Sequence, residues 1–215
     1  MEATLVILKP DATVRSFVGA YTTKVILDQG YRVTAFKWVQ VTGELAEKHY
    51  EEHAGKPFFN WLTTYIKAAP VVAMKVEGEN VIQGIRRMLG ATMAQKAEPE
   101  TIRGKYGIWG GVNVAHASDS PETAKRELAL WLTKAGLKEN ENGQEKAEEY
   151  AKSRQATKDY TKKLRETCKA LSERRVSIEH AREAIKQLLT EENPNAKPHH
   201  ISNLTEAIIQ NFLLP

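Results

Sequence analysis

The apolar residues of the first 137 positions alternate between two spacings, that of a buried β-strand and that of an amphipathic helix. A continuous run, Leu5-Val6-Ile7-Leu8, is typical of a central strand buried on both faces, and helical spacing follows from Val14 to Val25 until Gly30. The same patterns predict strands at 33–41, 71–74 and 114–116 and helices at 43–53, 81–89 and 120–132. This β-α-β-α-β-α-β-α order predicts an α/β fold (an α+β sandwich) of the ferredoxin-like type, a four-stranded antiparallel sheet with helices covering one face.

The last 78 residues differ in composition from the rest. They hold 27 charged residues, while all four Trp lie before them. The shift predicts a domain at 1–137 and a charged helical extension at 138–215. Asn203 and Glu206 form a possible capping box for its last helix, and His199-His200 follow Pro198 in a loop before it. In all, three helices are predicted in the extension, at about 143–172, 178–189 and 204–212.

The apolar stripes of these three helices need a surface to cover. The sequence leaves three options, which are each other, the first domain, or another subunit. It therefore leaves open whether the extension is an appendage packed on the domain or on a subunit interface, or a separate small interaction module. Only Leu164 and Leu171 repeat at a spacing of seven, so a long coiled coil is not expected.

Charge and cysteine content narrow the class of protein. The 31 basic and 27 acidic residues give a net charge of +4, so the composition does not require a nucleic-acid partner. The single cysteine, Cys168, excludes an intramolecular disulfide framework and a Cys-rich zinc site, and it is expected to be a packing residue. We therefore expect a reducing compartment, the cytoplasm. No apolar run approaches the roughly 18 residues of a membrane span, and the N-terminus lacks the basic start of a signal peptide.

Seven short motifs occur in the first domain. They are Leu8-Lys9-Pro10-Asp11, His49-Tyr50, Pro57-Phe58-Phe59, Gly78-Glu79-Asn80-Val81, Arg87-Met88-Leu89-Gly90-Ala91-Thr92, Thr101-Ile102-Arg103-Gly104, and Asn113-Val114-Ala115-His116-Ala117-Ser118-Asp119-Ser120. In their order and spacing they resemble the nucleoside diphosphate kinase family. The resemblance is specific and covers roughly residues 2–132, whereas the extension lies outside the common family pattern.

His116 is the candidate nucleophile for such a reaction. Moving a γ-phosphoryl group between nucleotides without losing it to water is served by a side chain that holds it covalently, and a neutral imidazole does so near pH 7. Of the six histidines, only His116 lies at a predicted strand end between small residues, Ala115 and Ala117, just before a capped helix.

Glu127 is the candidate orienting residue. Ser120 and Pro121 are a typical N-cap and first residue of a helix, on which Glu127 falls within the inward-facing apolar stripe. An isolated buried carboxylate would cost several kcal/mol, so a partner is expected. A hydrogen bond to one ring nitrogen of His116 would fix the tautomer and leave the other nitrogen free to attack.

The resemblance implies further roles, substrates and a cofactor. It implies transfer of the γ-phosphate of a nucleoside triphosphate (NTP) to a nucleoside diphosphate (NDP) by a ping-pong mechanism through a phosphohistidine, in a homo-oligomer. Mg²⁺ would be held mainly by the nucleotide phosphates, with no metal ligand from the protein. The implied residues are Glu127 and Ser118 beside His116, Lys9, Arg86, Thr92, Arg103 and Tyr50 around the phosphates, Asn113 at the ribose, and Phe58 on the base.

Departures from the family pattern leave the phosphate and nucleophile positions intact. Ala12 stands where the family usually has Gly, Gly110 replaces a commoner apolar residue near the base, and Val112 replaces a frequent Arg. Base and subunit contacts are therefore open. His49 and His53 have a spacing that could bind zinc, but no third ligand is visible and we expect no such site.

Two other functions remain open from the sequence alone. One is a catalytically silent nucleotide-binding scaffold on the same fold, although neither the nucleophile nor the phosphate cations are missing. The other is a nucleic-acid-binding protein, favoured only by the pI of about 9.0 and by a basic run at 158–169 that acids interrupt. A phosphate-loop kinase is excluded because the chain lacks the G-x-x-x-x-G-K-[ST] motif.

Overall fold

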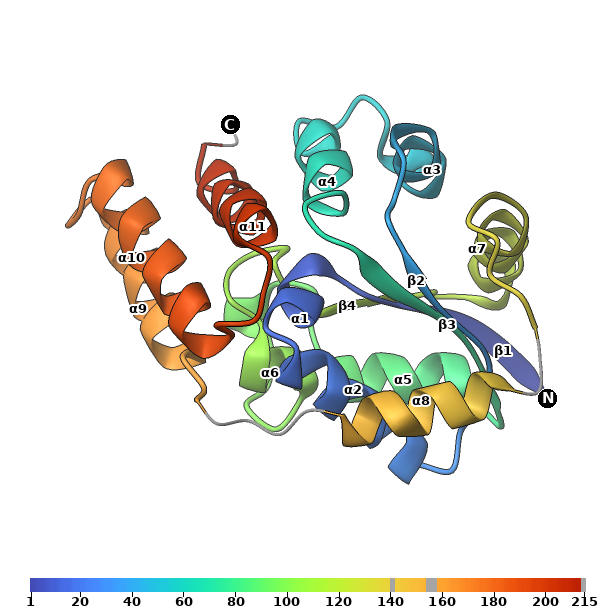
Figure 1. The fold of residues 1–215 in the computed structure, drawn as a ribbon. Coiled ribbons are helices and arrows are strands. Elements are labelled where there is room, and N and C mark those ends of the chain that lie inside the picture. Colours follow the sequence, from blue (N-terminus) through green and yellow to red (C-terminus); the bar gives the residue numbers. More distant parts are fainter. Residues whose placement is uncertain (140–141, 154–157, 214–215) are drawn as a thin grey trace.

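Four antiparallel strands form one sheet at the centre of the molecule (Figure 1). The structure is a computed structural model that describes residues 1–139, 142–153 and 158–213. The spatial order is β2-β3-β1-β4, and all three neighbouring pairs are antiparallel, which confirms the ferredoxin-like sheet. The strands are β1 (Glu2–Leu8), β2 (Arg32–Val39), β3 (Val71–Gly78) and β4 (Ala115–Ala117).

Helices cover both faces of the sheet, not one face as the sequence predicted. The apolar residues of β1 alternate between the faces, with Val6 and Leu8 in one buried cluster and Leu5 and Ile7 in another. A strand that is apolar on both faces needs cover on both, which is why the one-sided expectation was wrong. One face carries α2 (Phe17–Asp28), α5 (Val81–Leu89) and α8 (Asn142–Lys152), and the other carries α3 (Gly43–His49), α4 (Phe59–Tyr65) and α7 (Pro121–Lys134).

Short segments connect these helices and strands. The helix predicted from Val14 begins instead at Phe17, because Ser16 has a left-handed φ of 62° that separates it from a short preceding helix. The helix α4 was not predicted. The connecting helices are α1 (Pro10–Val14), the 3₁₀ turns Glu51–His53 and Ala94–Lys96, and α6 (Ile102–Tyr106).

The described part of the extension contains four helices, not three. They are α8, α9 (Thr161–Ser172), α10 (Ile178–Glu192) and α11 (Pro198–Gln210), so the single helix predicted at 143–172 is in fact two. The last helix begins earlier than predicted because Pro198 occupies its first position, where a missing N–H costs nothing. His199-His200 therefore lies in its first turn, and the capping box was wrong. Asn203 lies within the helix and donates to the Ala68 carbonyl at 3.3 Å.

The helix α8 covers the edge strand β2. The Val33 backbone N–H donates to Oε1 of Gln144 at 2.9 Å, as a neighbouring strand would accept it. A Cβ on Gly143 would lie 2.8 Å from the backbone of Thr34, so only glycine allows this approach. The first helix of the extension thus packs directly on the sheet.

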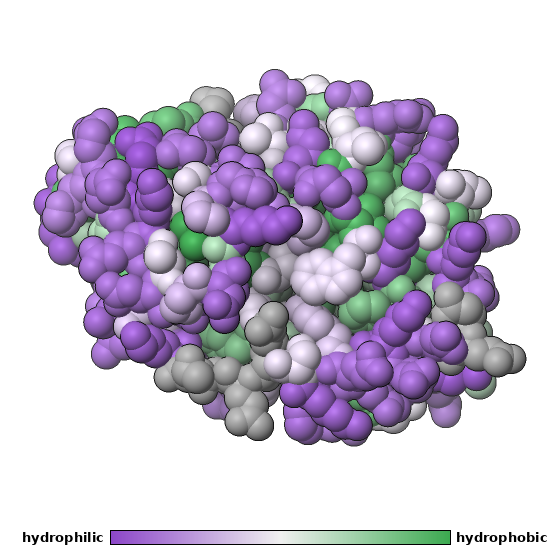
Figure 2. All heavy atoms as spheres, viewed as in Figure 1, coloured by the Kyte–Doolittle hydropathy of each residue, from purple (hydrophilic) through white to green (hydrophobic). Residues whose placement is uncertain are grey.

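The helices α9, α10 and α11 share a second buried cluster with the first domain. Leu164, Cys168 and Ile208 of the extension pack in one cluster with Trp61 and Tyr65 of α4. The buried Cys168 is thus the packing residue that was predicted. The outward face of α10 is polar, as Figure 2 shows at the left of the molecule. The stripes therefore cover each other and the domain.

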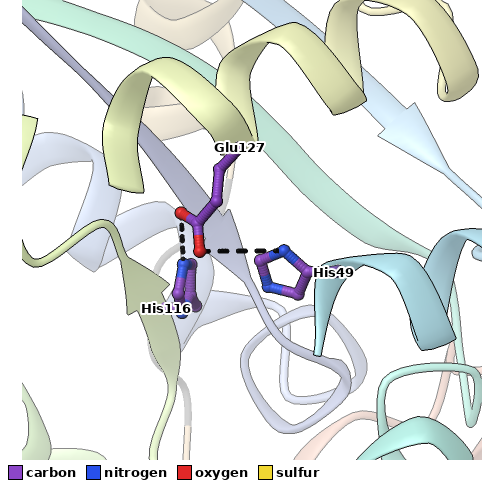
Figure 3. Close-up of side chains that lie close together, drawn as sticks. All are labelled: His49, His116 and Glu127. Atoms are coloured by element: carbon purple, nitrogen blue, oxygen red, sulfur yellow. Dashed lines mark hydrogen bonds and ion pairs between the residues drawn. The ribbon is translucent and has the colours of Figure 1, made fainter. Parts of the chain in front are cut away.

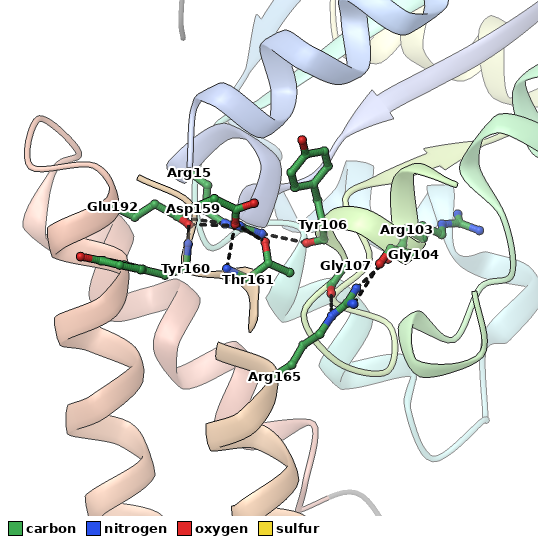
Figure 4. Close-up of polar contacts among 10 residues, drawn as sticks. All are labelled: Arg15, Arg103, Gly104, Tyr106, Gly107, Asp159, Tyr160, Thr161, Arg165 and Glu192. Carbon is green, nitrogen blue, oxygen red and sulfur yellow. Dashed lines mark hydrogen bonds and ion pairs between the residues drawn. The ribbon is translucent and has the colours of Figure 1, made fainter. Parts of the chain in front are cut away.

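A buried ion pair joins the extension to the domain (Figure 4). Arg15 donates from Nε to Glu192 at 2.6 Å and from Nη2 to Thr161 at 2.6 Å, and the side chains of Arg15 and Glu192 are fully buried. Nη1 of Arg15 donates to the Tyr106 carbonyl at 2.8 Å. Arg15 thus links α6, α9 and α10. None of the described helices is long and apolar enough to span a membrane.

Candidate active site

A pocket of about 500 Å³ opens beside β4 and the start of α7. Nine of the ten residues that the sequence singled out line it, and the tenth, Ser118, lies directly behind Glu127. The lining predicted residues are His116, Glu127, Lys9, Tyr50, Phe58, Arg86, Thr92, Arg103 and Asn113. The structure thus brings together side chains from positions 9 to 127 of the sequence.

The imidazole of His116 is held by Glu127 (Figure 3). Nε2 of His116 lies 2.8 Å from Oε2 of Glu127, and the Ser118 hydroxyl donates to the same oxygen at 2.7 Å. The predicted cap places Glu127 here, because the Ser120 side chain accepts from the Thr123 N–H and starts α7 in the expected register. The expected partner of the buried carboxylate is therefore His116.

The electrostatics of Glu127 define the tautomer of His116. Burial by itself would raise the pKa of Glu127, but the hydrogen bond and the charge interaction with His116 outweigh it and lower the pKa. An ionised carboxylate only accepts hydrogen bonds, so Nε2 of His116 carries the proton. Nδ1 is then the nitrogen with a free lone pair.

His49 is the residue of this site that the sequence analysis missed. Its ring lies edge-on against that of His116, with centroids 4.6 Å apart, and Trp131 donates to its Nδ1 at 3.4 Å. Burial, followed by the proximity of His116, holds the pKa of His49 well below its usual range, so the ring is neutral and makes no ion pair with Glu127 at 3.9 Å. The spacing between His49 and His53 suggests only a zinc site. The neighbours of His49 in the structure are instead His116 and Trp131, which lie far from it in the sequence.

His49, His116 and Glu127 are the one group in the described part of the chain with enough close His, Cys, Asp or Glu atoms to share a metal ion. Two nitrogen donors and one carboxylate suit a transition metal better than Mg²⁺, which prefers oxygen ligands. The carboxylate of Glu127 is already shared between Ser118 and His116. Glu127 therefore holds the imidazole of His116, and we assign no metal ion to these three residues.

The turn before His116 is strained and firmly held. Val114 has a φ of 76°, unusual for a β-branched residue, and the Ala115 N–H donates to the Asn113 carbonyl two residues back at 2.9 Å, as in a γ-turn. Asp11 accepts from the Val114 N–H at 2.9 Å, and the Lys9 N–H donates to the Val114 carbonyl at 2.9 Å. Such strain persists where several contacts fix it, and it occurs at functional sites.

Lys9 places a buried amino group in the pocket. Its Nζ donates to Oδ1 of Asn113 at 2.8 Å, and Nδ2 of Asn113 donates to the Thr92 carbonyl at 2.6 Å. Burial, with a further contribution from the Arg103 charge, lowers the pKa of Lys9 to about 7. Lys9 therefore changes charge near neutral pH, and an anion in the pocket would favour its charged form.

Arg103 has a structural role as well as a place in the pocket. It donates to the carbonyls of Gly90 and Ala115 at 2.8 Å and of Asn113 at 3.3 Å. Burial and the neighbouring charge of Arg86 lower its pKa to about 10. Arg86 is exposed at the pocket rim. Arg86 and Arg103 thus bring two positive charges to the pocket, which suits phosphate groups.

The hydroxyl of Tyr50 has no partner among the described residues, although it is buried. Burial raises its pKa, so the group is a neutral hydroxyl that can donate. A buried hydroxyl without a hydrogen bond costs free energy, so this one is free to donate. Tyr50 lines the pocket, so a ligand oxygen could accept this hydrogen bond.

The backbone that carries Arg103 is in turn held by the extension. Arg165 of α9 donates to the carbonyls of Arg103, Gly104 and Gly107 at 2.9, 2.9 and 2.7 Å (Figure 4). Val112, one of the departures from the family pattern, is buried in the cluster shared with α9, α10 and α11. Arg165 and the cluster around Val112 thus connect the extension to the walls of the pocket.

Comparisons with known proteins identify a family for most of the chain. The sequence model of a family described as "Nucleoside diphosphate kinase" matches residues 2–137. A nucleoside diphosphate kinase from Staphylococcus epidermidis is 46% identical over 137 residues, which are 64% of this chain and 91% of the relative. One from Pyrococcus furiosus is 49% identical over 135 residues, or 61% of this chain and 83% of the relative.

Solved structures give the same result. A halophilic nucleoside diphosphate kinase from Halobacterium salinarum in complex with CDP has a TM-score of 0.59 at 38% identity, covering 65% of this chain and 93% of that one. The Aquifex aeolicus enzyme also has a TM-score of 0.59, at 34% identity, covering 64% and 99%. These matches cover about two thirds of the chain.

Proposed function

The chain belongs to the nucleoside diphosphate kinase family, and from this premise we propose that it moves the γ-phosphate of an NTP to an NDP by a ping-pong mechanism through His116. The observation that carries the proposal is the 2.8 Å hydrogen bond between Nε2 of His116 and Glu127, backed by Ser118. This bond leaves Nδ1 as the attacking atom.

The two half-reactions use the same atoms in opposite order. The Nδ1 lone pair forms a bond to the γ-phosphorus while the bond from phosphorus to the bridging oxygen breaks, and the first NDP leaves. An oxygen of the terminal phosphate of the second NDP then attacks this phosphorus, and the P–N bond breaks. Nε2 keeps its proton throughout, and the carboxylate of Glu127 stabilises the positive charge that develops on the ring of His116.

The other pocket residues neutralise and position the phosphates. Catalysis of phosphoryl transfer depends largely on positioning and charge stabilisation. The ammonium of Lys9 and the guanidinium of Arg86 supply positive charge, and Arg103 retains N–H groups beyond those given to carbonyls. The unpaired hydroxyl of Tyr50 supports a hydrogen bond to a phosphate oxygen. Thr92 at the phosphates, Asn113 at the ribose and Phe58, which is 38% exposed, at the base complete the proposal.

Mg²⁺ fits this pocket as a companion of the nucleotide. The pocket carboxylates Glu52 and Asp119 are exposed and Glu127 is engaged with His116, so we propose that phosphate oxygens supply most of its ligands. Bound in this way, the ion would neutralise phosphate charge.

The proposal is tested by exchange of label from γ-labelled ATP to an unlabelled NDP. His116→Ala should abolish exchange, since no other described histidine combines the Glu127 contact with access to the pocket. His180→Ala, an exposed histidine on α10, is the matched control and should exchange at the wild-type rate. Undiminished exchange by His116→Ala would refute the proposal.

The two alternative functions receive less support. The nucleophile, its orienting carboxylate and the cations share one pocket, which disfavours a silent scaffold. The basic run that favoured nucleic acid offers less free charge than its sequence suggests, because Arg165 donates to three backbone carbonyls and Lys169 lies 3.9 Å from Glu173. We further propose, as the resemblance implied, a homo-oligomer in the cytoplasm, which sedimentation and cell fractionation would test.

A further inference from the structure

The lining of the nucleotide pocket divides into two chemically different walls. The charged wall surrounds His116 and includes Lys9 and Arg103. The apolar wall consists of Phe58, Trp61 and Leu62 around α4, together with Met93 from the loop after α5. Under the proposed function the phosphates lie against the charged wall. The base, which is flat and largely apolar, then belongs against the apolar wall.

The extension contributes a polar side chain to this pocket. Asn211, directly after α11, is the one described residue beyond position 137 among those that line it. Contacts of the residues before and after Asn211 fix its location. Trp61 donates from Nε1 to the Ala207 carbonyl at 2.8 Å, and the rings of Trp109 and Phe212 stack with centroids 5.6 Å apart.

Gly110 makes room for the amide of Asn211. A Cβ at position 110 would lie 2.5 Å from Nδ2 of Asn211, closer than any real contact, and the φ of Gly110 is +54°. Gly110 is also a position at which the sequence departs from the family pattern. The amide of Asn211 therefore occupies space that a side chain at position 110 would otherwise take.

The hydrogen bonds of Asn211 leave its oxygen available. Nδ2 donates to the Trp109 carbonyl at 3.4 Å, which sets the orientation of the amide because a carbonyl can only accept. Within the described part of the chain, Oδ1 of Asn211 accepts no hydrogen bond. Asn211 thus brings an unused acceptor oxygen to the lining of the pocket.

We propose that Asn211 reads the nucleotide base, with Oδ1 accepting a hydrogen bond from an exocyclic amino group. The inference rests on the proposed kinase function and assigns base selectivity to the extension. Substrates whose bases carry an amino group would be favoured over the same bases without one. A hydrogen bond with a net contribution of about 0.5–1.5 kcal/mol corresponds to a preference of roughly 2- to 13-fold.

The test compares acceptor pairs in which an amino group is either missing, as in IDP against GDP, or replaced by a carbonyl, as in UDP against CDP and IDP against ADP. The measured quantity is kcat/KM with a fixed NTP donor for GDP against IDP, for CDP against UDP, and for ADP against IDP, in the wild type and in Asn211→Leu. We expect a preference for the amino-bearing partner in at least one pair of the wild type, and its loss in Asn211→Leu. The nucleotide pair whose kcat/KM ratio changes in Asn211→Leu identifies which amino group of the base Asn211 contacts.

Each outcome bears on one proposal only. The two kcat/KM values of a ratio are measured on the same enzyme preparation, so the concentration of folded protein cancels. A variant that is only less stable therefore keeps the wild-type ratio. Asn195→Leu, an exposed residue before α11, should keep every wild-type ratio. An active wild type without any amino preference, or ratios unchanged in Asn211→Leu, would overturn the inference. A wild type inactive with every NDP would instead overturn the proposed function.

Discussion

The first domain and the extension contribute to the pocket in different ways. The domain supplies every candidate reacting or phosphate-binding group, with His116 on the short strand β4, Glu127 on the capped helix α7, and a strained turn at Val114 before the strand. The extension supplies no such group, yet it buries Glu192 against Arg15 and reaches the pocket with Asn211. The domain thus carries the candidate chemistry, while the extension supports the walls of the pocket and adds one polar side chain to it.

The largest effect on stability is expected at the ion pair between the two parts. Glu192→Ala leaves the guanidinium of Arg15 buried without its main counter-charge, so the free energy of unfolding should fall by roughly 3–5 kcal/mol. Denaturant titration measures this loss. Glu179→Ala, an exposed acid on the same helix, is the control and should change it by less than about 0.5 kcal/mol.

A double variant separates the charge from the packing. Arg15→Met with Glu192→Leu removes both charges and should recover much of the stability lost in Glu192→Ala. If Glu192→Ala were as stable as the control, the pair would not be what holds the extension on the domain.

The next largest effect concerns the chemical step. Glu127→Gln keeps a hydrogen bond to His116 but removes the negative charge that stabilises the imidazolium, so phosphorylation of the protein by NTP should slow by about 10²-fold or less. Nucleotide binding should change little. Rapid-quench measurement of phosphoenzyme formation gives the rate. A large loss of nucleotide affinity at an unchanged rate would make Glu127 a binding residue instead.

The smallest effect is a proton taken up by Lys9. Because the pKa of Lys9 is lowered to about 7 in the free protein, the side chain is mostly neutral at pH 8 and charged at pH 6. Phosphates favour the ammonium, so nucleotide binding at pH 8 should take up close to one proton, and affinity should fall as pH rises above about 7.

Calorimetry in buffers with different ionisation enthalpies counts this proton. Lys9→Arg should remove the uptake, because a guanidinium stays charged, whereas Lys24→Arg, an exposed residue on α2, should not. Equal uptake by the wild type and Lys9→Arg would assign the proton to another group.

The sequence predicted those features of the structure that depend on residues close to one another in the chain. The strand periods, the Ser120 cap and the inward position of Glu127 each depend on neighbouring residues only, and the structure confirms them. The sheet cover on the second face was not predicted, because its helices could not be assigned to a face from their own pattern.

The remainder depends on contacts between distant parts of the chain. His49 packs on His116 only because α3 and β4 meet, and the spacing to His53 favoured a different interpretation. The thin stripe at 143–172 could not reveal that α8 lies on the sheet while α9 joins the second cluster. No sequence signal linked Asn211 to Gly110, since their contact forms only when α11 docks on α4.

The most direct test of the central claim is to locate the phosphate on the protein after incubation with γ-labelled ATP and Mg²⁺. The account predicts acid-labile, base-stable label on Nδ1 of His116, identified by mass spectrometry of the peptide and by ³¹P NMR of the phosphoenzyme. The same label should be discharged when an NDP is added. Label on Nε2, on a residue of the extension, or on no residue while exchange continues would contradict it.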